Sequence, residues 1–287
     1  MILGLLLFTA VLLFIVLSGY KAYRYARMPL HGRMELYPVP AEKGRHQYGG
    51  SYMEEPEWWR KPRQTSKTSE LIEMLKEMLF IKKLFQHQRS LWWISYAFHL
   101  GIYFMIAWTL LLLAGALTDL AGISVSAHAS LWTGLLYYLT IFTGVVGFII
   151  TTAGAALLLL RRVADPVLKK YTTPQEYFNL LLLLAVLLSG IIVWSPDLTF
   201  EASRQLTAGV LLLDVTANTA LTIHLLLLAV MFIYIPLSKM GHYVGKYFSF
   251  HKVLWENEPN VPGSLMESRV KSSLSSHISN GGKAADR

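Results

Sequence analysis

Cysteine is absent from this chain of 287 residues, and charged residues are scarce. Without thiols the chain forms no disulfide, holds no zinc through cysteine, attaches no haem through a CxxCH motif and ligates no iron–sulfur cluster by itself. Only 15% of the residues are charged and 54% are hydrophobic, whereas soluble domains carry about 25% charged residues. This composition argues against a soluble globular protein and against disorder. The sequence also lacks an internal repeat and a glycine-rich phosphate-binding motif.

Five apolar segments are each long enough for a bilayer core, which needs about 20 residues. They cover residues 2–20, 91–117, 131–160, 177–194 and about 210–237. The first has no basic region before it and no small-residue cleavage site after it, which favours a retained anchor over a signal peptide. The expected fold class is therefore an all-α integral membrane protein, a bundle of five transmembrane helices.

The basic residues predict how these helices are oriented. Of the 26 lysines and arginines, 14 lie in residues 21–90, 4 in 161–172 and 7 after the fifth segment, which places 25 on one side. Basic loops mark the cytoplasmic side, so we expect the N-terminus outside and the C-terminus inside. Arg204 is the single exception. The charges are dispersed rather than gathered in a recognition motif, so membrane lipid and not nucleic acid is the expected partner.

The loops suggest a division of the chain into four parts. Residues 1–20 form the first transmembrane helix, and residues 21–90 form a cytoplasmic segment with an amphipathic helix at about 68–85. That helix suits either a lipid surface or a dock for a cytoplasmic subunit. Residues 91–255 form a four-helix core. Residues 256–287 are polar and rich in serine, which predicts a flexible tail or a partner-binding arm.

Three of the nine histidines are the main candidates for a function. His99 is in the second apolar segment, His224 is in the middle of the fifth, and His242 follows its cytoplasmic end. A histidine in a membrane helix is costly and is a functional candidate by default. On one continuous helix the 18 residues from His224 to His242 make five turns, which puts both on one face about 27 Å apart. This spacing suits two haems held between facing helices; an interhelix hydrogen bond, a proton relay and a transition-metal site are the alternatives.

Several motifs accompany these histidines. The second segment contains Phe98-His99-Leu100-Gly101-Ile102, and a leucine run at 157–160 leads into Arg161-Arg162, Pro166 and Thr172-Thr173. The last group is His224, Pro236, Ser238, Lys239 and His242. In these motifs the chain resembles the gamma (cytochrome b) subunit of respiratory nitrate reductase and the related membrane subunits of Dsr-type and heterodisulfide-reductase-like menaquinol oxidoreductases. The resemblance covers about residues 90–255.

The resemblance implies one or two haem b groups. His99 and His242 would ligate the haem nearer the cytoplasm, and His224 would ligate the outer one together with a histidine ten residues after His99. That position is Thr109 here. The missing ligand could be His128; other arrangements pair His99 with His224 and His87 with His242, or hold a single haem.

The resemblance also implies a function. The chain would pass electrons between a membrane quinol or quinone, such as menaquinone, and a cytoplasmic iron–sulfur partner subunit in the inner membrane of a prokaryotic cell. Quinol-site candidates are Asp214 and Asn218, with His128 and His224 nearby; a carboxylate or imidazole there could accept protons. The direction of electron flow stays open. The alternative function is a haem-free membrane anchor or a small transporter.

Overall fold

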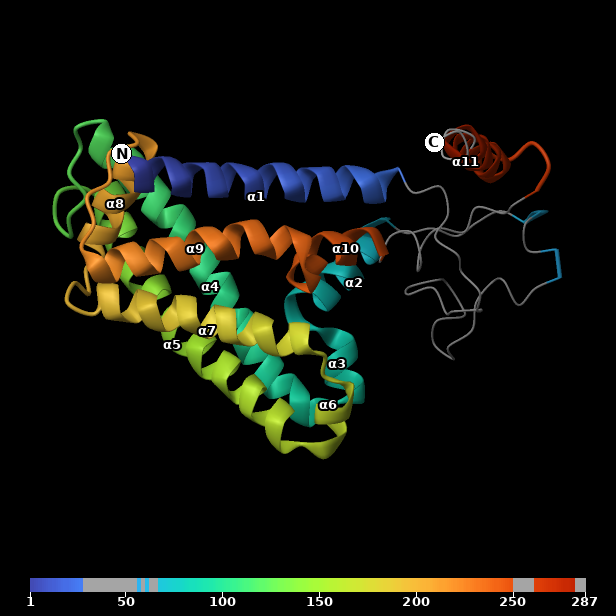
Figure 1. Ribbon diagram of the computed structural model, residues 1–287, viewed down its shortest axis with the longest axis horizontal. Coiled ribbons are helices and arrows are strands. Elements are labelled where there is room, and N and C mark those ends of the chain that lie inside the picture. Colours follow the sequence, from blue (N-terminus) through green and yellow to red (C-terminus); the bar gives the residue numbers. More distant parts are fainter. Residues whose placement is uncertain (28–55, 58–59, 62–66, 250–260, 282–287) are drawn as a thin grey trace. The chain divides into compact units, whose positions relative to one another are not determined.

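The computed structural model describes residues 1–27, 56–57, 60–61, 67–249 and 261–281, and its regular elements there are all helical (Figure 1). Most of the predicted irregular part of the cytoplasmic segment, and residues 250–260 at the end of the predicted core, lie outside the described residues. The chain divides into two compact units. The first comprises residues 1–17 with 83–240, and the second comprises residues 18–82 with 241–287.

In the described part of the chain, five helices are long and apolar enough to cross a bilayer. They are α1 (Ile2–Ala26), α4 (Arg89–Leu120), α5 (Leu131–Ala164), α7 (Pro174–Trp194) and α9 (Thr219–Leu237). The five predicted transmembrane segments are thereby confirmed as helices. In Figure 1, α4 and α5 run diagonally across the direction of α7 and α9.

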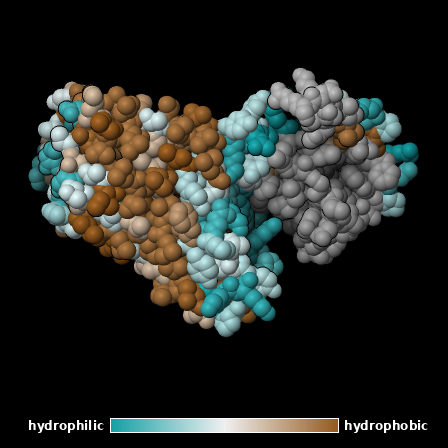
Figure 2. Space-filling model, in the orientation of Figure 1, coloured by the Kyte–Doolittle hydropathy of each residue, from teal (hydrophilic) through white to brown (hydrophobic). Residues whose placement is uncertain are grey.

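Large apolar side chains cover the outside of these helices. Leu110 of α4, Ile149 of α5 and Leu188 of α7 are each more than half exposed. Figure 2 shows hydrophobic residues spread over the helices of the first unit, with hydrophilic residues gathered at its α3 and α6 end. Such a surface is stable against lipid tails and would be unfavourable in water.

The fifth segment begins later than the sequence predicts. A separate helix α8 (Glu201–Leu211) precedes a loop, and Leu213 in that loop has a positive φ of 58°. The Asn218 side chain then accepts a hydrogen bond from the Leu221 backbone N–H at 2.9 Å and caps α9. The expected start near residue 210 is therefore wrong, because hydropathy does not register this break and cap.

Glycines allow α4 and α5 to pack closely. A Cβ added to Gly101 would lie 2.6 Å from the Thr151 backbone nitrogen, and one added to Gly154 would lie 2.7 Å from the Phe98 Cα. No side chain fits at either position without moving the facing backbone. Pairs of membrane helices commonly approach closely at small residues. Here the close approach fixes the part of α4 that contains His99 against α5.

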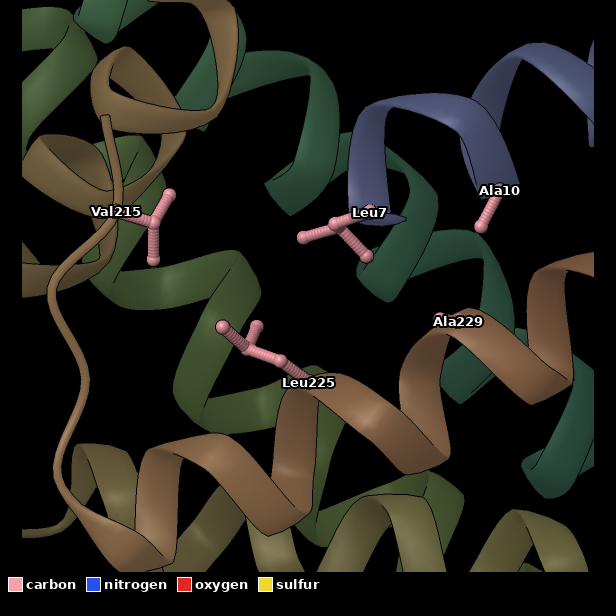
Figure 3. Close-up of a cluster of buried hydrophobic side chains, with 5 residues drawn as sticks. All are labelled: Leu7, Ala10, Val215, Leu225 and Ala229. Carbon is pink, nitrogen blue, oxygen red and sulfur yellow. The ribbon is translucent and has the colours of Figure 1, made fainter. Parts of the chain in front are cut away.

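A hydrophobic cluster joins α1 to α9 (Figure 3). Leu7 and Ala10 come from α1, Leu225 and Ala229 from α9, and Val215 from the loop before α9. Ala10 and Ala229 are small, so the two helices approach closely there.

The second unit joins the end of α1 to three shorter helices, α2 (Lys67–Phe80), α10 (His242–Ser249) and α11 (Leu265–Gly281). The Lys246 ammonium of α10 donates to the buried Glu77 carboxylate of α2 at 2.6 Å. The Tyr25 ring packs against the Phe248 ring at 6.0 Å. These contacts hold α10 between α1 and α2.

Two features of the loops differ from the sequence predictions. The helix expected at about 68–85 is broken at Ile81, whose φ is 52°, and continues as α3 (Lys82–His87). Helix α11 lies in the segment expected to be a flexible tail. The remaining short helices are α6 (Pro166–Tyr171) and η3 (Lys239–Gly241).

Candidate functional site

His224 lies half-buried on α9 and faces Ser189 of α7. The Ser189 Oγ is 3.0 Å from the His224 Nδ1, and the same hydroxyl donates to the Val186 carbonyl at 3.0 Å. A serine hydroxyl has one hydrogen, so with that hydrogen used it accepts from the imidazole. His224 therefore carries its proton on Nδ1, which leaves the lone pair on Nε2.

Gly190 creates the space for this imidazole. A Cβ at Gly190 would lie 3.1 Å from the His224 Cε1 and 3.0 Å from the Phe148 Cε1. The ring of His224 therefore lies at a close approach of α7, with Phe148 of α5 beside it. Nearer the start of α7, the Tyr234 hydroxyl of α9 donates to the Asn179 side chain at 2.8 Å. This is a second hydrogen bond between α9 and α7.

His99 on α4 has the same tautomer, but its hydrogen-bond acceptor is a backbone carbonyl of its own helix. Its Nδ1 is 2.7 Å from the Ser95 carbonyl oxygen. A carbonyl only accepts hydrogen bonds, so Nδ1 carries the proton and Nε2 carries the lone pair. Ligating histidines in proteins are commonly oriented by such a bond from the second ring nitrogen. Both membrane-embedded histidines thus have the tautomer that coordinates a metal through Nε2.

His242 is not on the same continuous helix as His224. Helix α9 ends at Leu237, with Pro236 in its last turn and Ser238 in an extended conformation, and His242 opens α10 in the second unit. The continuous helix assumed between the two histidines is therefore wrong, and the shared face and the 27 Å separation stay predictions. The pairing of His242 with His99 stays a prediction.

The residues considered for the remaining ligand position lie as follows. The Thr109 hydroxyl donates to the Met105 carbonyl of its own helix at 2.9 Å. His128 is exposed in the loop between α4 and α5, and His87 is exposed at the end of α3. Among the described residues, no group of three or more histidines and carboxylates is arranged to hold a free metal ion.

The two quinol-site candidates lie at the start of α9 rather than inside it. Asp214 is exposed in the loop between α8 and α9, where its backbone N–H donates to the Gly209 carbonyl at 2.8 Å. Asn218 is also exposed, and its side-chain oxygen is used to cap α9. Their place in a quinol site stays a prediction.

The motif between α5 and α7 is held by hydrogen bonds at one end of the first unit. The Arg162 guanidinium donates to the Thr172 hydroxyl at 3.2 Å, and the Tyr177 hydroxyl donates to the Arg162 carbonyl at 3.2 Å. Lys239, from the motif after the fifth segment, pairs with Glu176 of α7 at 3.7 Å. The structure thus brings together two motifs that are far apart in the sequence.

Sequence reasoning missed a buried ion pair and an aromatic cluster. Arg204 of α8 is 4% exposed, and its Nε lies 3.2 Å from an Asp119 carboxylate oxygen of α4. The cluster contains Trp108, Phe148, Trp194 and Phe200, with neighbouring ring centroids 5.2–5.4 Å apart. The only signal in the sequence was the isolation of Arg204 from all the other basic residues.

Comparison with protein families gives a match to the nitrate reductase gamma subunit over residues 83–253, which is more than half of the chain. The match includes α4, α5, α7, α8 and α9 and contains all the candidate ligands: His87, His99, His128, His224 and His242. Comparison with curated proteins and with solved structures returns no match.

Proposed function

The chain belongs to the nitrate reductase gamma subunit family, and on this premise we propose that it transfers electrons between a membrane quinol or quinone and a cytoplasmic iron–sulfur partner. The family consists of membrane b-type cytochrome subunits of respiratory complexes. When bound, haem b supplies reversible one-electron transfer. The chain has no cysteine, so the iron–sulfur centre belongs to another subunit.

The observation that carries the proposal is the shared tautomer of His99 and His224. In each ring the Nδ1 proton is held by an oxygen of a helix, and Nε2 keeps its lone pair. Neutral imidazole with a free electron pair is the form that ligates haem iron. The bond from His224 to Ser189 is also an interhelix hydrogen bond, and the haem measurement below distinguishes that role from haem ligation.

The proposed ligand assignment follows the family motifs. His99 and His242 would hold the haem nearer the cytoplasm, and His224 would hold the outer haem, with His128 as the candidate for its second ligand. In this proposal His242 and Lys239 lie on the cytoplasmic side of a prokaryotic inner membrane, the side that the basic loops predict. On the opposite side, Asp214 is the proposed proton acceptor for quinol oxidation, since it is the exposed carboxylate beside the start of α9.

The test is a reduced-minus-oxidised absorption spectrum of the purified chain, with extracted haem counted per polypeptide. A b-type spectrum that loses one haem in His224→Leu supports the proposal. His128→Ala is the matched comparison: loss of the same single haem assigns His128 to the outer site, and an unchanged count removes it. A folded, membrane-inserted chain without haem would contradict the proposal and favour the membrane-anchor function.

A further inference from the structure

Helix α2 exposes its apolar residues and buries a carboxylate. Glu77 is 5% exposed, whereas five large apolar side chains of the same helix are 42–51% exposed. These five are Leu71, Ile72, Leu75, Leu79 and Phe80. A helix that packs on a protein core in water has the opposite arrangement, with its apolar residues inside and its charges outside. The exposed side of α2 therefore suits nonpolar surroundings.

Four of these side chains form an apolar stripe along α2. Leu71, Leu75 and Leu79 recur every fourth residue, and Ile72 lies beside them. At 3.6 residues per turn, the four positions fall within an arc of about 100°. This is the width of the apolar face that an amphipathic helix buries. Glu77 lies on the other side of the helix, about 170° from the middle of the apolar stripe.

The side of α2 opposite the apolar stripe is held by α10. The Lys246 ammonium of α10 donates to the Glu77 carboxylate at 2.6 Å. Helix α10 in turn contacts α1, where the Tyr243 hydroxyl lies 2.6 Å from the Ser18 hydroxyl. Ser18 is near the end of the apolar segment of the transmembrane helix α1. These contacts put α10 at the level where α1 leaves the bilayer, and α2 directly beside α10.

Short connections also keep α2 and α10 close to the bilayer. Residues 81–88 separate α2 from the transmembrane helix α4, and residues 238–241 separate α10 from the transmembrane helix α9. The first connection would span at most about 30 Å if it were fully extended, and it is shorter because it contains the helix α3. The apolar stripe is therefore within reach of the membrane surface.

The charges of α2 are compatible with a lipid surface. The Glu73 carboxylate accepts a hydrogen bond from Lys76 at 2.9 Å and another from Lys82. Glu77 is neutralised by Lys246 in the same way. Because both carboxylates are paired, they do not repel anionic lipid headgroups. Lys76 is half-exposed beside the apolar stripe, where a lysine can extend its ammonium group to the headgroups.

We propose that the apolar stripe of α2 lies in the boundary between headgroups and acyl chains, in the leaflet where α1 ends. Amphipathic helices of this kind bury their apolar face about 5–10 Å into the boundary. Helix α2 then anchors the segment between α1 and α4 to the membrane surface. It precedes the residues that match the family, so this inference does not depend on the proposed function.

The test takes advantage of the absence of cysteine from the chain. The full-length variant Leu75→Cys is labelled with a fluorophore and reconstituted into vesicles of phosphatidylcholine and phosphatidylglycerol in equal amounts. One sample contains a phospholipid with a quencher at the top of its acyl chain, and another contains aqueous iodide on both sides of the membrane. We expect the lipid quencher to reduce the fluorescence about twofold or more, because the label lies at the depth of that quencher.

Leu274→Cys is the matched control. Leu274 of α11 is 59% exposed, but Lys271 and Ser275 beside it are exposed as well, so no apolar stripe surrounds it. Its label should be quenched by iodide and not by the lipid quencher. The label at position 75 should be about fivefold less sensitive to iodide than this control.

Two results would overturn the proposal. If iodide quenches the label at position 75 as strongly as it quenches the control, the apolar stripe lies in water and is open to a cytoplasmic partner subunit. If the label is shielded from both quenchers, a protein surface such as a second copy of the chain covers the apolar stripe. Leu79→Cys, one turn further along the same stripe, replaces Leu75→Cys if that variant does not insert.

Discussion

Replacing Gly154 with alanine should force α4 and α5 apart beside His99. The added Cβ would lie 2.7 Å from the Phe98 Cα and 2.9 Å from the Phe98 nitrogen, whereas ordinary contacts begin at 3.4 Å. The facing atoms belong to the backbone, so no side chain can rotate away. One helix must therefore move by about 0.7 Å or more, and His99, the next residue after Phe98, moves with it.

The expected loss of stability follows from two opposing effects. Overpacking of a tight contact costs about 1–3 kcal/mol, and a backbone clash belongs at the upper end of that range. Alanine is the better helix former by about 1 kcal/mol. The net loss in the free energy of unfolding should therefore be about 1–2 kcal/mol.

Gly19→Ala is the matched control, because an added Cβ at Gly19 of α1 has no atom within 4 Å. This variant should be as stable as wild type or more stable by up to about 1 kcal/mol. The measurement is unfolding in mild detergent by titration with a denaturing detergent, followed by far-UV circular dichroism. Equal midpoints for Gly154→Ala and Gly19→Ala would refute the close-packing argument.

Three further predictions concern the ends of helices and the proposed ligand. Ser189→Ala removes the acceptor that orients His224 and should weaken haem binding about 10–100-fold in a titration of the haem-free chain. An unchanged affinity for haem would contradict this role of the serine. Asn218→Ala should lower the free energy of unfolding by about 0.5–2 kcal/mol through loss of the α9 cap, whereas Asn218→Asp keeps the cap; thermal unfolding distinguishes the two. Burial raises the pKa of Asp197, but hydrogen bonds from Thr199 and the Ala202 backbone outweigh it and hold the pKa below the ordinary 3.8. The stability that Asp197 contributes is therefore complete above pH 3.8 and is lost as the pH falls through its lower folded value, so Asp197→Asn should be less stable than wild type at pH 6 and equally stable in strong acid.

The transmembrane architecture was readable in the sequence because a bilayer imposes a simple rule. A spanning helix needs about 20 apolar residues, and α1, α4, α5 and α7 begin and end within a few residues of the predicted limits, apart from the longer C-terminal end of α1. The ligand candidates His99 and His224 were visible for the same reason, since a polar side chain in an apolar segment is conspicuous. The motifs were enough to suggest the family that the comparison with known families supports.

The tertiary structure decided what periodicity and hydropathy do not encode. The break before Thr219 depends on the positive φ of Leu213 and the Asn218 cap, and both lie within an apolar run. The tautomer of His224 depends on Ser189, which is 35 residues away in the sequence. The burial of Arg204 depends on Gly115 and Asp119 of a different helix. Hydropathy measures how each residue partitions into the membrane, whereas hydrogen bonds and close contacts arise only when particular helices face each other.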